Sequence, residues 1–156
     1  EMSADLLMQF YNYAVGSIGV SALFMDGQWF YEHHTEEAYC LTNTNCGYYI
    51  ISGSRDMHIN IVSQYAQGQD QLRHRWKAHE STIMRVRILS DDSKLFSCGF
   101  DGKIKVWDID TSNSVEKQPT LSHEWEAHSP WAYDICLSPD ETKLLSAGSD
   151  LSAKIW

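Results

Sequence analysis

The feature of this 156-residue chain that most constrains its fold is an internal repeat. The stretch from Leu72 to Trp107 aligns without a gap with the stretch from Leu121 to Trp156, and every residue meets its counterpart 49 positions later. Histidine, serine, aspartate and tryptophan recur at the same spacing in both copies. Chance does not produce such a match, so the chain must be built from repeated structural units.

Two weaker copies precede this pair. Tyr48 to Val62 matches the end of the Leu72 copy at an offset of 45, which places Asp56 on Asp101. Further back, Val15 to Asp26 fits the Tyr48 copy at an offset of 37. The offsets of 37, 45 and 49 bracket a period of about 40–45 residues, which is typical of propeller blades.

Within each copy, apolar and polar residues alternate with a period of two, as at Ile104 and Val106. The alternation is broken by SDDSK, SPDET and FDGK, a pattern that predicts short half-buried strands joined by tight turns. Longer polar joins near 63–70 and 110–118 are predicted to be loops between a third and a fourth strand. No stretch shows a convincing amphipathic helix, so we expect an all-β fold.

Composition limits the class of partner. With 43% hydrophobic and 12% aromatic residues the chain is globular, and its net charge of -9 argues against nucleic acid or anionic membranes, which need a basic surface. An acidic protein is better suited to basic peptides. Cys40, Cys46, Cys98 and Cys136 form no CxxC pair. We therefore expect reduced thiols in an intracellular protein, cytoplasmic or nuclear.

One uncharged run, Leu6 to Met25, is long enough to span a bilayer. It contains Gln9 and Asn12, and Asp5 and Asp26 flank it instead of basic residues. We therefore predict no membrane insertion. The glycines of GSIG lack the lysine and the helix of a phosphate-binding loop, so no cofactor is expected.

The motifs resemble those of the WD40 repeat family. Ala-His at 78–79 and 127–128 stands where the family usually has Gly-His, Ser-x-Gly-x-Asp turns end at Asp101 and Asp150, and Asp108 follows Trp107. The resemblance covers essentially the whole chain, most strongly from Leu72 onward. It implies a β-propeller of nearly four four-stranded antiparallel blades, which form part of a larger, seven-bladed ring. The blades are expected at about 1–31, 32–76, 77–125 and, incomplete, 126–156.

The early copies depart from the family pattern. Val62 and Met25 stand where tryptophan is expected, and Gly19 stands where the turn aspartate is expected. These blades are predicted to be less well braced. The chain also stops at Trp156, before an outer strand of the last blade, so we expect it to belong to a longer protein.

A serine, a histidine and an aspartate in each copy suggest by type an acyl-transfer triad. A triad needs an exposed nucleophile and only one copy, whereas these sets recur. The resemblance instead implies buried hydrogen-bonded tetrads that hold each blade together. The predicted members are His34, Ser52 and Asp56; His79, Ser97, Asp101 and Trp107; and His128, Ser146, Asp150 and Trp156. The pairs His74/His79 and His123/His128 lack a third metal ligand, so neither a metal site nor a catalytic residue is predicted.

The resemblance also implies a partner-binding face, formed by side chains around the start of each inner strand and just before each turn aspartate. These candidates are Glu37, Tyr39 and Arg55; Thr82, Met84 and Phe100; and Trp131, Tyr133 and Ser149. Aromatic residues with Met and Arg are typical of interface hot spots.

The sequence thus favours a non-catalytic platform that binds other proteins or peptides as a subunit of a larger intracellular complex. One alternative is the sensor or targeting propeller of a multidomain enzyme whose catalytic part lies outside this chain. Another is a reader of basic peptides such as histone tails. A fold alone decides among these no further.

Overall fold

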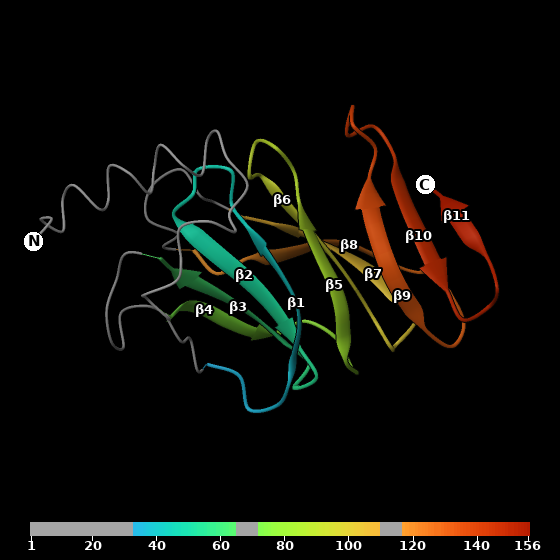
Figure 1. The fold of residues 1–156 in the computed structure, drawn as a ribbon, viewed down its shortest axis with the longest axis horizontal. Coiled ribbons are helices and arrows are strands. Elements are labelled where there is room, and N and C mark those ends of the chain that lie inside the picture. Colours follow the sequence, from blue (N-terminus) through green and yellow to red (C-terminus); the bar gives the residue numbers. More distant parts are fainter. Residues whose placement is uncertain (1–32, 65–71, 110–116) are drawn as a thin grey trace, which may run out of the picture. The chain divides into compact units, whose positions relative to one another are not determined.

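The structure is a computed structural model that describes residues 33–64, 72–109 and 117–156. Within these residues, eleven strands form three antiparallel sheets, and no helix is present (Figure 1). The predicted blade at 1–31 lies outside the described residues, as do the early repeat copy, the apolar run at 6–25, and Gly19 and Met25. None of the described segments forms a helix that could cross a membrane.

In each sheet the strands follow the order of the chain, and each strand pairs with the next. The first sheet contains β1 (Ala38–Asn43), β2 (Tyr49–Ser54), β3 (His58–Ser63) and β4 (Leu72–Lys77). The second contains β5 (Ile83–Ile88), β6 (Lys94–Gly99), β7 (Lys103–Asp108) and β8 (Thr120–Glu126). The third contains β9 (Ala132–Leu137), β10 (Leu144–Gly148) and β11 (Ala153–Ile155). The all-β prediction of four-stranded antiparallel blades is confirmed.

The core lies between neighbouring sheets, because each sheet buries one face against the next. Ile51, Ile59 and Trp76 of the first sheet pack with Val86 and Leu95 of the second. Trp76 contacts Trp107 edge-to-face, with ring centroids 5.6 Å apart. A second cluster joins the second sheet to the third. Burial of this apolar surface is the main force that holds the sheets together.

The inner strands of the three sheets lie side by side, with β1 next to β5 and β5 next to β9 (Figure 1). The turn between β6 and β7 shows why the sheets can approach so closely. Gly102 adopts a left-handed backbone (φ +76), and a Cβ atom there would lie 2.2 Å from the carbonyl oxygen of His128. Only glycine fits this turn. The carbonyl oxygen of Gly102 also accepts the backbone N–H groups of Ala127 and His128.

Candidate functional site

The four tetrad residues of the second sheet form one continuous hydrogen-bonded chain. The indole Nε1 of Trp107 donates to the hydroxyl of Ser97 over 2.9 Å. That hydroxyl lies 2.8 Å from Nε2 of His79, and Nδ1 of His79 lies 2.9 Å from the Asp101 carboxylate. An ionised carboxylate only accepts, so Nδ1 carries the proton and Nε2 accepts from Ser97.

Electrostatics keep the Asp101 carboxyl group ionised. Burial raises the pKa of Asp101, but bonds from His79 and from the backbone N–H groups of Glu80 and Lys103 outweigh it and hold the pKa at about 2. Ser97 and His79 are fully buried. The Ser97 hydroxyl is therefore sealed from solvent with both of its partners in place, and no substrate can reach it. The geometry suits internal bracing, not nucleophilic attack.

The third sheet repeats the same arrangement. His128 lies 2.8 Å from Asp150 and 2.8 Å from Ser146, and Trp156 donates to Ser146 over 2.9 Å. Bonds from Ser152, His128 and Lys154 lower the pKa of Asp150. The second and third sheets thus hold the same hydrogen-bonded set of four residues at equivalent positions of the repeat.

The first sheet holds a different network around its histidine. His34 lies 2.8 Å from Ser52 and 3.0 Å from Asp56. The tryptophan position is taken by the buried Val62, which has no group to donate. Burial raises the pKa of Asp56, but bonds from the backbone of Thr35 and His58 and from His34 lower it to about 2.

Two residues that the sequence analysis did not single out complete this network. Arg75 on β4 donates to the Asp56 carboxylate over 3.1 Å and to the carbonyl oxygen of His33 over 3.1 Å. Asn60, buried on β3, donates to the same carbonyl over 2.9 Å. This arrangement leaves Oδ1 of Asn60 and Nε2 of His33 buried with no hydrogen-bond partner among the described residues. The signal available in the sequence was an arginine at the position where the next copy has Glu124.

Among the described residues, no group of three His, Cys, Asp or Glu side chains is placed to hold a metal ion. His79 and His128 are engaged in the tetrads, and His123 lies 2.9 Å from the hydroxyl of Ser122. The four cysteines are free thiols; Cys40 and Cys98 are buried, and Cys46 and Cys136 are exposed.

The nine residues of the predicted partner-binding face occupy three equivalent positions in each sheet. In each sheet, the residue before the turn aspartate donates its backbone N–H to the carbonyl oxygen of the first member of the set. The N–O distances are 2.9 Å to 3.0 Å. These pairs are Arg55 to Glu37, Phe100 to Thr82 and Ser149 to Trp131.

The second member of each set is the extra residue of a β-bulge at the start of the inner strand. The strand register skips Tyr39 in β1, Met84 in β5 and Tyr133 in β9. A bulge releases its extra residue from the regular alternation and re-aims the side chain. Tyr133 would otherwise share a face with the buried Ile135, but its side chain stays 39% exposed. The same backbone device thus presents one side chain from each sheet.

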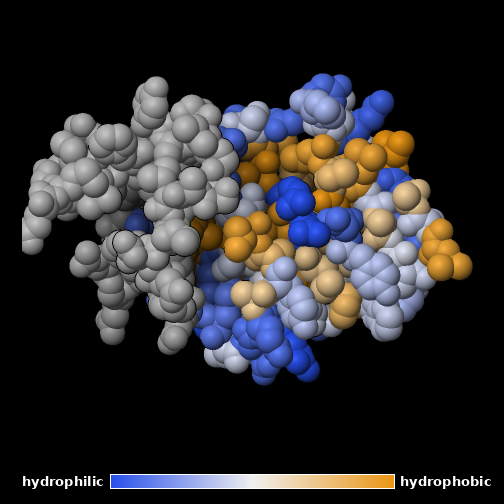
Figure 2. Space-filling view, viewed as in Figure 1, coloured by the Kyte–Doolittle hydropathy of each residue, from blue (hydrophilic) through white to orange (hydrophobic). Residues whose placement is uncertain are grey.

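Three of these side chains meet at the seam between the second and third sheets. The ring of Phe100 lies 5.4 Å from the ring of Trp131 and 5.9 Å from that of Tyr133, and the last two are 6.3 Å apart. Trp131 is 43% exposed, whereas Phe100 is half-buried beneath them. We call Phe100, Trp131 and Tyr133 the aromatic cluster. Figure 2 shows apolar side chains gathered around β5 and β9, with hydrophilic side chains among them.

The first sheet contributes charge to the predicted face instead of aromatic surface. Arg55 and Glu37 form an exposed ion pair of 3.2 Å, beside the exposed Tyr39. Arg85 on β5 and Asp134 on β9 form a second pair of 2.6 Å, which links the second and third sheets. The predicted face therefore has a charged part and an aromatic part.

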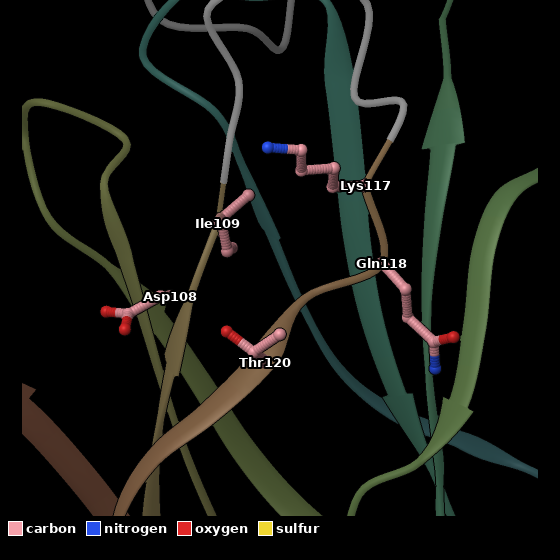
Figure 3. A pocket seen from close by; sticks show the side chains of 5 residues that line it. All are labelled: Asp108, Ile109, Lys117, Gln118 and Thr120. Carbon is pink, nitrogen blue, oxygen red and sulfur yellow. The ribbon is translucent and has the colours of Figure 1, made fainter.

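A cavity of about 230 Å³ is lined by residues at the end of β7 and the start of β8 (Figure 3). Its lining contains Asp108, Ile109, Lys117, Gln118 and Thr120. The Asp108 carboxylate is already paired with Lys94. Among the described residues that line it, no nucleophile lies beside a base, so we assign no chemistry to this cavity.

Comparisons with known proteins agree with this architecture. A sequence model described as "WD domain, G-beta repeat" matches residues 26–63, 70–108 and 119–156. Over 83 residues the chain is 31% identical to an uncharacterized WD repeat-containing protein of Schizosaccharomyces pombe. The matched stretch covers 53% of this chain and 15% of that protein. Over 84 residues it is 30% identical to the WD repeat-containing protein 26 homolog of Arabidopsis thaliana, which covers 54% of this chain and 14% of that protein.

A more distant relative has a name that describes an assembly. Over 68 residues the chain is 31% identical to the "Target of rapamycin complex 1 subunit mip1" of Schizosaccharomyces pombe, which covers 43% of this chain and 5% of that protein. The matched parts of these three relatives span 15%, 14% and 5% of their lengths.

Proposed function

Because the chain belongs to the WD40 repeat family, we propose that it is a non-catalytic module that binds other proteins, and that the aromatic cluster is its main anchor. The two tetrads and the set of His34, Ser52 and Asp56 are proposed as structural braces, since their serines are hydrogen-bonded inside the sheets. The nine predicted face residues then form the partner-binding surface of a rigid scaffold.

The aromatic cluster is the observation that carries this proposal. Large aromatic side chains are normally buried, yet Trp131 and Tyr133 stay 43% and 39% exposed. The backbone of Trp131 is held by Ser149, because its N–H donates to the Ser149 hydroxyl and its carbonyl oxygen accepts the Ser149 N–H, both over 3.0 Å. Tyr133 is aimed outward by the bulge of β9. Rigid, exposed aromatic rings lose little conformational entropy on binding and are typical hot spots.

The geometry also indicates how a partner would bind. The three ring centroids are only 5.4 Å to 6.3 Å apart, so the rings contact one another instead of surrounding an opening. A cage for a methylated ammonium group needs rings that surround the cation. The cluster therefore favours a partner that lays an apolar or planar side chain across the rings. We accordingly place the basic-peptide reader second.

The position of the chain within a larger assembly is part of the same proposal. One relative is named as a complex subunit, and the family's repeats supply binding surfaces on a rigid scaffold. A catalytic domain elsewhere in the full-length protein stays compatible with this role, since the module would then direct that domain to its targets.

A double substitution tests the anchor. Proteins captured from a lysate of the source cells by the wild-type protein are identified and quantified, and capture is repeated with Trp131→Ala/Tyr133→Ala. Aromatic anchors each contribute about 2 kcal/mol or more to an interface, so we expect capture of the specific partners to weaken by at least about tenfold. The melting temperature should change little, since neither side chain belongs to a buried core cluster.

Leu121→Ala serves as the matched control. Leu121 is 46% exposed on the outer strand β8 and belongs to none of the predicted sets, so its loss should leave capture unchanged. Equal capture by the double variant and the wild-type protein would refute the anchor. Loss of capture together with unfolding would mean that the rings belong to the core.

A further inference from the structure

Two hairpin turns place an acidic residue in a backbone conformation that favours glycine. Asp92, between β5 and β6, has φ 59, and Glu141, between β9 and β10, has φ 55. They are 49 positions apart and thus occupy the same position of the repeat. The left-handed region costs a residue with a Cβ atom about 1 kcal/mol or more. Acidic residues at such a position indicate that the side chains make compensating contacts.

Asp92 reaches out of its own sheet to the turn between β1 and β2. Its Oδ1 accepts the backbone N–H of Asn45 over 2.7 Å and the Asn45 side-chain amide over 3.0 Å. Its Oδ2 accepts the backbone N–H of Cys46 over 2.9 Å. The amide of Asn45 also donates to the carbonyl of Leu89 over 2.9 Å. Asp92 is only 5% exposed, so its carboxylate is largely shielded from water.

Glu141 makes the corresponding contact one sheet further on. Its Oε1 accepts the backbone N–H of Ser90 over 2.8 Å, and its Oε2 accepts the Ser90 hydroxyl over 2.9 Å. Ser90 lies 45 positions after Asn45, the offset of the first repeat. Each acidic side chain therefore binds the same residue of the preceding turn.

The neighbouring carboxylates show that reaching across is a property of this one position. Asp91 accepts from the backbone and hydroxyl of Ser93 in its own turn. Asp140 likewise accepts from Ser138 and Thr142 in its own turn. Since each turn already has its own acceptor, Asp92 and Glu141 are free to bond the preceding sheet.

Residue type also stops the series on both sides. The position of Asp92 is occupied in the β1–β2 turn by Gly47 (φ 74), which has no side chain. The position of Asn45 and Ser90 is occupied in the third turn by Pro139, which has no backbone N–H to donate. Another sheet packed beyond either turn could not be bonded in this way.

We propose that Asp92 and Glu141 are inter-sheet staples that make the three described sheets open and close as one cooperative unit. The staples add directional, charge-assisted hydrogen bonds between the turns at one end of the sheets. Packing alone allows neighbouring sheets to open separately, whereas a carboxylate that is bonded to the preceding turn couples them. The unit ends at Gly47 and Pro139. This inference does not depend on the proposed binding function.

Native-state hydrogen exchange on the full chain tests this, with Asp92→Asn as the variant. Asparagine tolerates the left-handed backbone, but its amide nitrogen cannot accept from an N–H group. The variant keeps one acceptor oxygen and so loses one of the two backbone bonds. Bonds to a charged acceptor are strong, so we expect at least one of the Asn45 and Cys46 amides to exchange at least about tenfold faster. The amides of β1–β3 should then open at lower denaturant concentration than those of β5–β7, with which they open in the wild-type protein.

Asp91→Asn is the matched control, because it removes the same charge from the same turn and leaves the staple intact. It should leave both groups of amides opening together. Unchanged exchange at Asn45 and Cys46 in the Asp92 variant would overturn the proposal. Faster exchange at these amides would also overturn the proposal if the amides of β1–β3 and β5–β7 still became exposed at the same denaturant concentration.

Should Asp92→Asn fail to fold, Glu141→Gln carries the same test at a more exposed turn. The Ser90 amide should exchange faster, and β9–β10 should open before β6–β7. If those strands still open together, the staple proposal is wrong.

Discussion

Replacing Asp101 by asparagine removes the charge of one tetrad and preserves its shape. Asp101 accepts from the buried His79 ring over 2.9 Å and from the backbone N–H groups of Glu80 and Lys103 over 3.1 Å. Its pKa is about 2 in the folded protein, against an ordinary value of 3.8. This difference corresponds to about 2 kcal/mol of stability from the ionised form.

The sign of the pH dependence follows from the direction of the shift. A carboxylate whose pKa is lowered by folding stabilises the protein above the unfolded pKa, and this stability is lost as the pH falls through the folded pKa. The difference in unfolding free energy between the wild-type protein and Asp101→Asn should therefore be about 2 kcal/mol above pH 4. It should shrink as the pH falls towards 2, where the wild-type carboxyl becomes protonated.

The assay is chemical denaturation followed by tryptophan fluorescence at a series of pH values. Asp108→Asn is the control, because Asp108 is an exposed partner of Lys94 and surface pairs of this kind contribute little. A difference for Asp101→Asn that is below about 0.5 kcal/mol at pH 7 would refute the reasoning, since this is the range of ordinary surface substitutions. So would a difference that stays constant between pH 4 and pH 2.

Two further predictions concern the first sheet and the thiols. Arg75→Ala should lower the unfolding free energy by about 1–2 kcal/mol, since it removes a charged donor from the buried Asp56 and from the carbonyl of His33. Arg73→Ala, at an exposed position of the same strand, should leave the unfolding free energy unchanged. Equal effects of the two substitutions in thermal melts would contradict the role of Arg75. Burial raises the pKa of Cys40 to about 11 and also raises the pKa of Cys98. A thiol reagent at pH 8 should therefore label the exposed Cys46 and Cys136 and leave the buried pair unlabelled. Mass spectrometry that finds Cys98 labelled in the native protein would show that the seam between the sheets opens.

Much of the fold could be predicted from the sequence, because the information is local and repeated. Alternation of apolar and polar residues places side chains on opposite faces of a strand, and the polar turn sequences mark where strands end. The spacing of His79, Ser97 and Asp101 recurs in the next copy, so a common role could be inferred before any contact was known. The nine residues of the predicted face follow from the resemblance to the family, and their role in binding stays a prediction.

Other features depend on how side chains from different sheets meet. The bulge at Tyr133 separates it from the buried face of Ile135, although the sequence alternates without interruption. Phe100 meets Trp131 only because β5–β8 packs against the third sheet. Val62 predicted a poorly braced sheet, but Arg75 reaches Asp56 from another strand and compensates in part.

The staples show the same limit most clearly. Asp92 and Asn45 are 47 positions apart, and nothing in either turn sequence announces a bond between them. Their contact depends on a left-handed backbone at Asp92 and on the distance between two packed sheets. Local sequence determines strand, turn and repeat because backbone preferences act over a few residues. Only tertiary packing decides which donor a buried carboxylate meets, because that depends on how the separate sheets are positioned in space.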